Sequence, residues 1–337
     1  MARSDLLLNA IKFGFSGDRA KLKRATEAIV AEERHKQHNV LANKLEEVMQ
    51  SSEVKSFSSD SRVNDQKFAE LVQEVVPQKT INSLILPSEV KQVCSEFIQE
   101  HFRSDLLRSY NIDPRNRILL IGPPGNGKTS LAEGIAESLM IPLLIVRYES
   151  IIGSYLGETA SRLKKLIDYA CTRRCVLFFD EFETLGKERG DTHETGEIKR
   201  VVSSLLIQID ALPNHVIVVG ATNHPELLDR AVWRRFQIRM ELPSPTKSGL
   251  IEWFDRFERR IKTPLGYSSA RLAQEMDGAN FAEVEEFGKT IFRQFILSQP
   301  NASMKKIVTQ AMRQWKTIST TVEKKRRKIS ISKRAKK

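Results

Sequence analysis

A short glycine-rich segment constrains this chain more than any other part of its sequence. An apolar run at residues 117–121 leads into Gly-Pro-Pro-Gly-Asn-Gly-Lys-Thr-Ser, in which Gly122, Gly127, Lys128 and Thr129 satisfy the pattern G-x-x-x-x-G-K-[ST]. Such glycines let the backbone curl until successive N–H groups face phosphates, and a helix starting near Thr129 adds the positive end of its dipole. An ordinary glycine-rich turn is the alternative, but the position between an apolar strand and a helix favours phosphate binding.

The residue types in this segment suggest separate tasks. Lys128 brings a positive charge to the β- and γ-phosphates, and Thr129 brings a hydroxyl to Mg²⁺. We therefore expect ATP to contact the whole segment, which consists of Gly122, Pro123, Pro124, Gly125, Asn126, Gly127, Lys128, Thr129 and Ser130.

Two acidic residues follow a second apolar run. The run Cys-Val-Leu-Phe-Phe at 175–179 ends in Asp180 and Glu181. A carboxylate at the C-terminal end of a neighbouring parallel strand lies in the crevice where such sheets bind ligands, so Asp180 can hold magnesium through water and Glu181 can orient the attacking water. Two acids after a strand could also be a helix N-cap. With a phosphate loop upstream, they indicate a nucleoside triphosphate hydrolase site.

The order of the apolar runs predicts the fold class. Between residues 79 and 245, runs of four or five Val, Ile, Leu or Phe alternate with helical patterns, as a parallel sheet covered on both faces requires. We expect a doubly wound α/β fold with five strands, at Arg117–Ile121, Leu143–Val146, Cys175–Phe179, Val216–Val219 and Ile238–Leu242. Beyond Pro245 the spacing predicts helices at Lys247–Ile261, Ser268–Met276, Phe281–Leu297 and Met304–Trp315.

Composition divides the rest of the chain. Residues 1–50 carry apolar side chains at helical spacing and predict a small helical N-terminal domain, whereas residues 51–78 are rich in Ser and charge and predict a linker. We expect a large α/β subdomain at 79–245, a helical lid at 246–316 and a basic tail at 317–337. Of the formal net charge of +12, the last 15 residues contribute +8, so the body is close to neutral.

Several classes of protein are disfavoured by the same sequence. The longest strongly apolar run has eight residues, far below the roughly 20 needed to span a bilayer, so we expect no membrane insertion. Asp5 and Lys12 interrupt the N-terminal apolar stretch, which argues against a secretory signal. Three cysteines fit a reducing cytoplasm, and the pair Cys171 and Cys175 lacks neighbouring ligands for a metal.

Further motifs carry a resemblance to a known family. The run Val-Ile-Val-Val-Gly ends in Ala-Thr-Asn, which places Asn223 at a strand tip, and LDRAVWRRFQIRMELPSP follows. Together with GPPGNGKT and FFDE, these motifs resemble the AAA ATPase family, in particular the clade of katanin and the membrane-remodelling and unfolding machines, over residues 79–300. The resemblance implies a P-loop NTPase fold of the AAA+ type, ATP and Mg²⁺ as ligands, and a hexameric ring.

The resemblance also implies roles for individual residues. Asn223 would be the sensor that contacts the attacking water and γ-phosphate, and Arg234 and Arg235 would be arginine fingers that complete a neighbour's site. An arginine fork neutralises charge developing on the transferred phosphoryl group. Two solvated charges are the alternative for the arginines. In the segment DGANFAEV, Gly278 and Ala279 would approach the adenine and ribose, unless they form a simple loop.

A third match concerns the substrate. In family members that thread polypeptides, an aromatic residue at the position of Tyr155 projects into the channel of the hexamer and contacts the substrate, although Tyr155 could instead pack under its loop. Gly153 and Ser154 precede it where basic residues are more usual. His193 and Glu194 do not extend to the H-E-x-x-H of a zinc protease, because residue 197 is Glu.

Two functions remain open at this point. The first is a ring-shaped ATPase that remodels or unfolds proteins; the order of its parts also resembles bacterial defence-system ATPases that act beside a separate subtilisin-type protease. The second is a DNA-associated regulator of transposition or repair that binds nucleic acid through the basic tail. The tail could also be a solvated end, and it has no aromatic residues for base stacking. A non-enzymatic scaffold is disfavoured because the predicted catalytic residues are all present.

Overall fold

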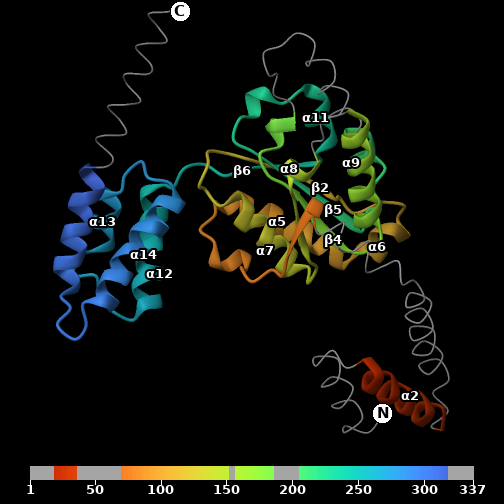
Figure 1. Ribbon diagram of the computed structural model, residues 1–337, viewed down its shortest axis with the longest axis horizontal. Coiled ribbons are helices and arrows are strands. Elements are labelled where there is room, and N and C mark those ends of the chain that lie inside the picture. Colours follow the sequence, from red (N-terminus) through yellow and green to blue (C-terminus); the bar gives the residue numbers. More distant parts are fainter. Residues whose placement is uncertain (1–18, 36–69, 152–155, 186–204, 318–337) are drawn as a thin grey trace, which may run out of the picture. The chain divides into compact units, whose positions relative to one another are not determined.

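The computed structural model divides the chain into two compact units, Met1–Lys67 and Phe68–Lys337 (Figure 1). It describes residues 19–35, 70–151, 156–185 and 205–317. In the first unit the described part is one helix, α2 (Arg19–His35), on which Ala25, Ile29 and Val30 are buried. None of the helices in these ranges is both long and apolar enough to cross a membrane.

The second unit is built around a mixed sheet whose strand order is β1-β3-β4-β5-β2-β6. All strand pairs are parallel except β1–β3, which is antiparallel. The strands are β1 (Val72–Val75), β2 (Arg117–Ile121), β3 (Leu143–Val146), β4 (Cys175–Phe179), β5 (Val216–Thr222) and β6 (Ile238–Glu241). The five parallel strands are those predicted from the apolar runs.

Strand β1 was not predicted, and it lies in the segment expected to be a linker. Its sequence, Val-Gln-Glu-Val, alternates instead of forming an apolar run, and its two central residues are exposed. Among the described strands it pairs only with β3, from Val72 opposite Val146 to Val75 opposite Leu143. An edge strand needs one buried face at most, so such a strand leaves a weak sequence signal.

Helices cover both faces of the sheet, as expected for an α/β fold. One face packs against α9 (Leu156–Cys171), a helical segment at residues 205–210, and α11 (Arg230–Arg235). The other packs against α5 (Ser88–Phe102) and α7 (Lys128–Ser138). Side chains alternate between these two cores along β2, β3, β4 and β5: in β2, Leu119 joins the first, whereas Ile118 and Leu120 join the second. The short elements are η1 (Ile81–Ser83), α6 (Ser104–Ser109), α8 (Tyr148–Ile151), η2 (Phe182–Leu185) and η3 (Pro225–Leu227).

The region after β6 is helical, as predicted, and has its own core. It contains α12 (Lys247–Ile261), α13 (Ser269–Glu275), α14 (Phe281–Leu297) and a further helical segment at residues 304–317 (Figure 1). The starts follow from their caps, since the side chain of Thr246 accepts from Gly249 N and that of Asn280 from Glu283 N. We call this region the lid.

Candidate nucleotide site

The glycine-rich segment forms a tight loop between the end of β2 and the start of α7, and we call it the P-loop (residues 122–129). Gly127 precedes α7 with a φ of +87°, a conformation that side chains disfavour. At Gly122 a Cβ atom would lie 2.2 Å from the carbonyl oxygen of Leu242. Glycine is therefore required at both positions for the loop to wrap as it does.

Lys128 points back into this loop. Its Nζ donates to the carbonyl oxygens of Gly122 and Pro123 at 2.7 and 3.0 Å, and to Oδ1 of Asn223 at 2.6 Å. Burial lowers the pKa of Lys128 from its usual 10.5, and the negative charges of Asp180 and Glu183 oppose that shift. The ammonium group is thus held beside the strand tips, where an anionic phosphate would be stabilised by it.

Thr129 and Asp180 come together from the start of α7 and the end of β4. The Thr129 hydroxyl donates to Oδ2 of Asp180 at 3.3 Å, and Oδ1 of Asp180 accepts from the backbone N–H of Glu181 at 2.9 Å. A hydroxyl beside a carboxylate is a donor set suited to Mg²⁺. Glu181 is exposed and has a φ of +45°, a conformation that costs a non-glycine residue about 1 kcal/mol or more.

A buried carboxylate that the sequence analysis missed supports Asn223. Glu183 has 2% of its surface exposed, and its Oε1 accepts from the backbone N–H of Asn223 at 3.3 Å. Asn223 in turn accepts from Lys128, so Glu183, Asn223 and Lys128 form one chain of contacts across three strand ends. The signal was a third acid within Asp-Glu-Phe-Glu, but local sequence does not reveal that it is buried.

Tyr148 was also missed. It begins α8, directly beyond β3, and its hydroxyl is buried without a hydrogen-bond partner among the described residues. Burial raises the pKa of this phenol well above its usual value, and Asp180, Glu183 and Glu181 reinforce the shift. A neutral hydroxyl therefore lies close to the acidic side of the site.

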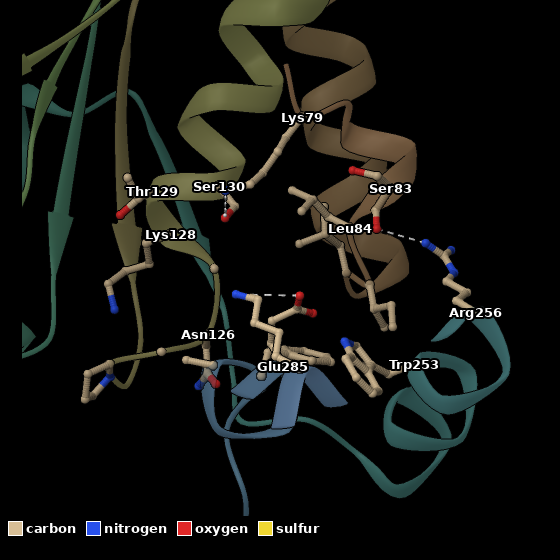
Figure 2. A pocket seen from close by; sticks show the side chains of 18 of the residues that line it. Lys79, Ser83, Leu84, Asn126, Lys128, Thr129, Ser130, Trp253, Arg256 and Glu285 are labelled. Carbon is tan, nitrogen blue, oxygen red and sulfur yellow. Dashed lines mark hydrogen bonds and ion pairs between the residues drawn. The ribbon is translucent and has the colours of Figure 1, made fainter. Parts of the chain in front are cut away.

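Most of the P-loop, Asp180, Glu181 and Asn223 line one cavity of about 860 Å³, a size usual for small-molecule sites. Its described lining comes from three sources: the P-loop and strand tips, the segment 79–86, and the lid. Figure 2 shows Trp253 and Glu285 of the lid across the cavity from Lys128 and Thr129. The basic lining residues are Lys79, Lys128, Arg256, Arg260 and Lys289, and the acidic ones are Asp180, Glu181 and Glu285. This excess of positive charge suits a polyphosphate.

Part of the cavity wall is apolar. Leu84, Ile85 and Leu86 line it from one side, and Trp253 and Phe257 from the other. The rings of Trp253 and Phe257 stack at 5.0 Å with 13° between their planes. The cavity lining therefore combines apolar and aromatic side chains, which suit a flat base, with basic side chains, which suit phosphates.

Polar contacts join the lid to the other two walls. Arg256 of α12 donates to the carbonyl oxygens of Asn82 and Ser83 at 3.1 and 3.0 Å (Figure 2). At the other wall, the backbone N–H of Ala282 in α14 donates to the carbonyl oxygen of Gly125 at 3.0 Å. The lid is thus bonded directly to the P-loop and to the segment that precedes α5.

Gly278 and Ala279, expected beside the adenine and ribose, are not among the described residues that line the cavity. Gly278 turns the chain ahead of the Asn280 cap of α14, and the Ala279 side chain, 3% exposed, packs in the lid core. The lid approaches the cavity one turn later, through Phe281, Ala282, Glu285 and Lys289.

Arg234 and Arg235 lie at the end of α11 and are not among the described residues that line the cavity. Arg234 is exposed. Arg235 donates from Nε to Oδ2 of Asp210 at 2.7 Å and from Nη1 to the carbonyl oxygen of Ala231 at 3.0 Å. The site in this chain therefore contains the P-loop, the acids and Asn223, but not the two arginines.

Some predicted residues lie outside the described ranges, namely Tyr155 and the basic tail beyond Thr317. Ser130 does line the cavity, and its Oγ accepts from Nζ of Lys79 at 3.0 Å. The cysteines Cys94, Cys171 and Cys175 are free thiols. In the described part of the chain, no cluster of three or more His, Cys, Asp or Glu side chains could hold a metal ion.

Comparison with known proteins agrees with this geometry. Residues 118–244 match the family described as "ATPase family associated with various cellular activities (AAA)". An uncharacterized AAA family ATPase, y4kL, of Sinorhizobium fredii is 32% identical over 301 residues, which cover 85% of this chain and 87% of that protein. A cell division cycle protein 48 homolog of Archaeoglobus fulgidus is 31% identical over 57% of this chain and 27% of its own length.

The 26S proteasome subunit RPT4 of Saccharomyces cerevisiae is 30% identical over 187 residues, which cover 53% of this chain and 43% of the subunit. The chain thus spans less than half the length of the last two relatives. The relative from Sinorhizobium is covered almost throughout, and the AAA match includes the P-loop, both acids after β4 and the paired arginines. The chain therefore belongs to the AAA family and is an ATPase.

Proposed function

We propose that this ATPase assembles into a hexameric ring in the cytoplasm and uses ATP hydrolysis to remodel or unfold protein substrates. The observation that carries the proposal is the division of the site. One chain supplies the phosphate loop, Asp180, Glu181 and Asn223 to a single cavity, while Arg234 and Arg235 lie apart from it. A ring with head-to-tail interfaces would bring each pair of arginines to a neighbour's cavity.

Within the cavity each residue has a chemical task. Lys128 and the backbone N–H groups of the P-loop would bind the phosphates. Thr129 and Asp180 would hold Mg²⁺, which supplies charge neutralisation between the phosphates when bound. Glu181 would orient the attacking water and Asn223 would contact the γ-phosphate, while Arg234 and Arg235 of the neighbouring subunit would stabilise the charge that develops there.

The buried Asn126 side chain supports a ligand at the P-loop. It is 4% exposed, and neither its oxygen nor its nitrogen has a hydrogen-bond partner among the described residues. A buried amide without partners costs free energy, about 1–3 kcal/mol for each lost bond. A nucleotide or a water held beside it would remove that cost.

The remodelling role draws on the relatives. One is named a cell division cycle protein 48 homolog and another a 26S proteasome subunit. By analogy, Tyr155 would contact a protein substrate and the domain at residues 1–50 would recruit it. A separate protease is a further proposed partner, to which the ring would deliver unfolded chains.

The test is the ATPase rate measured against protein concentration, first with the chain alone, then with a permanently unfolded protein, and then with DNA. A ring with shared sites predicts that the rate per subunit rises with concentration, and that unfolded protein increases it further. Glu181→Gln protein is the control for contaminating ATPases. Stimulation by DNA with a steep salt dependence, and none by unfolded protein, would instead support a DNA-associated regulator.

A further inference from the structure

Lys79 lines the cavity but is part of neither the P-loop nor the strand tips. It lies just ahead of η1, and its Nζ donates to Oγ of Ser130 at 3.0 Å (Figure 2). The same ammonium lies 3.1 Å from Oε2 of Glu133. Ser130 and Glu133 both belong to α7, the helix that begins at the P-loop. A lysine from outside the loop therefore adds a positive charge beside the first turn of this helix.

Glu133 holds both the backbone and the side chain of Lys79. Its Oε1 accepts from the backbone N–H groups of Gln78 and Lys79, each at 3.2 Å, while its Oε2 faces the ammonium. The Glu133 side chain is 15% exposed, compared with 52% for Lys79. Burial raises the pKa of Glu133, but these hydrogen bonds and the charge of Lys79 outweigh burial, so the pKa lies below its usual 4.5. The carboxylate is thus ionised and fixed at neutral pH.

The segment that carries Lys79 is packed tightly against α7. A Cβ atom on Gly134 would lie 3.2 Å from the backbone nitrogen of Ile81 and 3.1 Å from its Cγ1, so the two elements touch where α7 has no side chain. Thr80 caps η1, since its Oγ1 accepts from Ser83 N at 3.2 Å. The backbone around Lys79 is therefore fixed beside the P-loop, and its side chain is presented from a defined position.

Ser130 faces a different part of the cavity from the two residues before it. Side chains on a helix turn by about 100° per residue. Lys128 and Thr129 accordingly contact side chains at the strand tips, whereas Ser130 contacts the segment 79–86. That segment also supplies apolar side chains suited to a base. Because the base of a nucleotide is joined through its ribose to the α-phosphate, the phosphate nearest to Ser130 and Lys79 would be the α-phosphate.

The ammonium of Lys79 still has a donor available. A lysine ammonium has three N–H donors. One contacts Ser130 and another faces Glu133, and among the described residues none accepts the third. Ser130 keeps its own O–H as a donor as well, because its oxygen accepts from Lys79. Both side chains therefore have a donor left for an anion in the cavity that they line.

We propose that Lys79 is a further phosphate-binding residue, whose ammonium, positioned by Glu133, contacts the α-phosphate of the bound nucleotide beside Ser130. This inference rests on the binding of phosphates at the P-loop proposed above. ATP and ADP have the same α-phosphate, so the contact stabilises substrate and product alike. Lys79 therefore sets nucleotide affinity and has little influence on the rate of hydrolysis.

The experiment measures the binding of ADP and of a non-hydrolysable ATP analogue to the full chain by titration calorimetry. Lys79→Met keeps the length of the side chain but loses its charge. We expect the affinity for both nucleotides to fall by the same factor, about five- to twentyfold, because a charged hydrogen bond is lost at a partly exposed position. The KM for ATP should rise similarly, while turnover at saturating ATP stays within about twofold. Lys79→Arg keeps the charge and should bind more tightly than Lys79→Met.

A second variant separates a phosphate contact from simple neutralisation of Glu133. Lys79→Met leaves the Glu133 carboxylate without its cation, which by itself would repel phosphates. Combining Lys79→Met with Glu133→Gln removes both charges, while the amide oxygen can still accept from the backbone of Gln78. The double variant should remain weaker than wild type by about threefold or more. Affinity restored to that of wild type would show that Lys79 only neutralises the acid, and would overturn the inference.

Phosphorothioates locate the contact along the nucleotide. Sulfur in place of one non-bridging oxygen of the α-phosphate gives two diastereomers of ATP, and sulfur is the weaker hydrogen-bond acceptor. The diastereomer whose sulfur faces Lys79 should bind wild type less tightly, and Lys79→Met should reduce this preference by about twofold or more. An unchanged preference would place Lys79 away from the α-phosphate and overturn the inference.

Lys316→Met is the matched control. The Lys316 side chain in the lid is 62% exposed and lies 2.6 Å from Glu275, which is 24% exposed. Lys316 is not among the described residues that line the cavity. The same substitution there should leave both affinities within about twofold of wild type.

Lys128→Ala distinguishes the two ways in which the inference could fail. If Lys128→Ala binds both nucleotides like wild type, the phosphate site proposed above is wrong and the inference is lost with it. If Lys128→Ala loses binding while Lys79→Met binds like wild type, the phosphate site stands and only the role of Lys79 is wrong.

Discussion

The P-loop region and the α11 region contrast in how complete they are within one chain. Around the P-loop, groups from α7, β4, β5 and the lid meet in one cavity, and the Nζ of Lys128 has three hydrogen-bond acceptors. At α11, two arginines lie outside that cavity, one of them exposed and the other bound to Asp210. A region that is complete should bind its ligand in an isolated chain. The α11 region, whose arginines face no ligand within the described chain, needs another molecule before it can act.

The largest expected effect lies at the P-loop. Lys128→Ala removes the ammonium that contacts Gly122, Pro123 and Asn223, so we expect ATP affinity to fall about 100-fold or more, because a charge-assisted contact to phosphate is lost. Titration calorimetry with a non-hydrolysable ATP analogue measures this directly. Micromolar affinity retained by the variant would contradict the phosphate role, and Arg235→Ala should bind the analogue like wild type.

Glu181→Gln also acts at the P-loop region, and it separates ATP binding from ATP hydrolysis. The side chain lines the cavity but is exposed, so removing its charge should leave ATP affinity within about threefold and lower turnover at least 100-fold. ATP held without hydrolysis should also stabilise the ring. Single-turnover assays and size-exclusion chromatography with ATP measure the two effects; turnover like that of wild type would exclude Glu181 as the water-orienting residue.

Arg256→Ala should have a smaller effect, confined to binding. It removes two bonds from α12 to the carbonyl oxygens of Asn82 and Ser83. With that wall of the cavity less fixed, we expect the KM for ATP to rise about three- to tenfold and turnover to change little. Arg259→Ala is the control, because Arg259 lies on the same helix and donates to Asp255 of that helix instead. Equal effects of the two variants on the KM for ATP would show that the bonds of Arg256 to Asn82 and Ser83 do not support ATP binding.

The smallest predicted effect concerns His101, which belongs to neither region. His101 is 6% exposed, its ring lies 4.6 Å from that of Phe97, and its Nε2 contacts the carbonyl oxygen of Arg115 at 2.8 Å. Burial lowers its pKa below the usual 6.5, so protonation is more costly in the folded state and stability falls as the pH drops below 6.5. His101→Phe should remove this contribution.

Urea unfolding of wild type and His101→Phe between pH 7.5 and about 5 isolates the effect, because other acid-sensitive groups are common to both proteins. The difference in midpoint should shift in favour of the variant as the pH falls. A constant difference over this range would show that His101 does not contribute to the pH dependence.

Much of this fold could be predicted because its strong signals are local. Strands β2, β3, β4 and β5 are largely buried on both faces and read as apolar runs, and α12 and α14 begin and end where their spacing predicts. Strand β1 could not be predicted in this way, since a half-exposed edge strand has no such run. Its position depends on pairing with β3, about 70 residues later.

The candidate site likewise contains residues that could be predicted from the sequence and residues that could not. The P-loop and Asp180 have a motif, and their meeting follows from parallel strands ending at one edge. Glu183, Tyr148 and Lys79 have no motif of their own, because their importance lies in contacts such as that of Lys79 with Ser130, 51 residues away. For Gly278 and Ala279 a matching motif did not indicate which lid residues line the described cavity, and these begin at Phe281 in α14.

The hydrogen bond between the Gly125 carbonyl and the Ala282 N–H has a consequence for product release. It joins the floor of the phosphate cradle to the first turn of α14, so the lid cannot swing away from the cradle while the bond is intact. Departure of spent nucleotide and rotation of the lid should then occur as a single event. Release of nucleotide from a subunit would thereby be coupled directly to a change in the orientation of its lid, and the change would not have to be transmitted through the sheet.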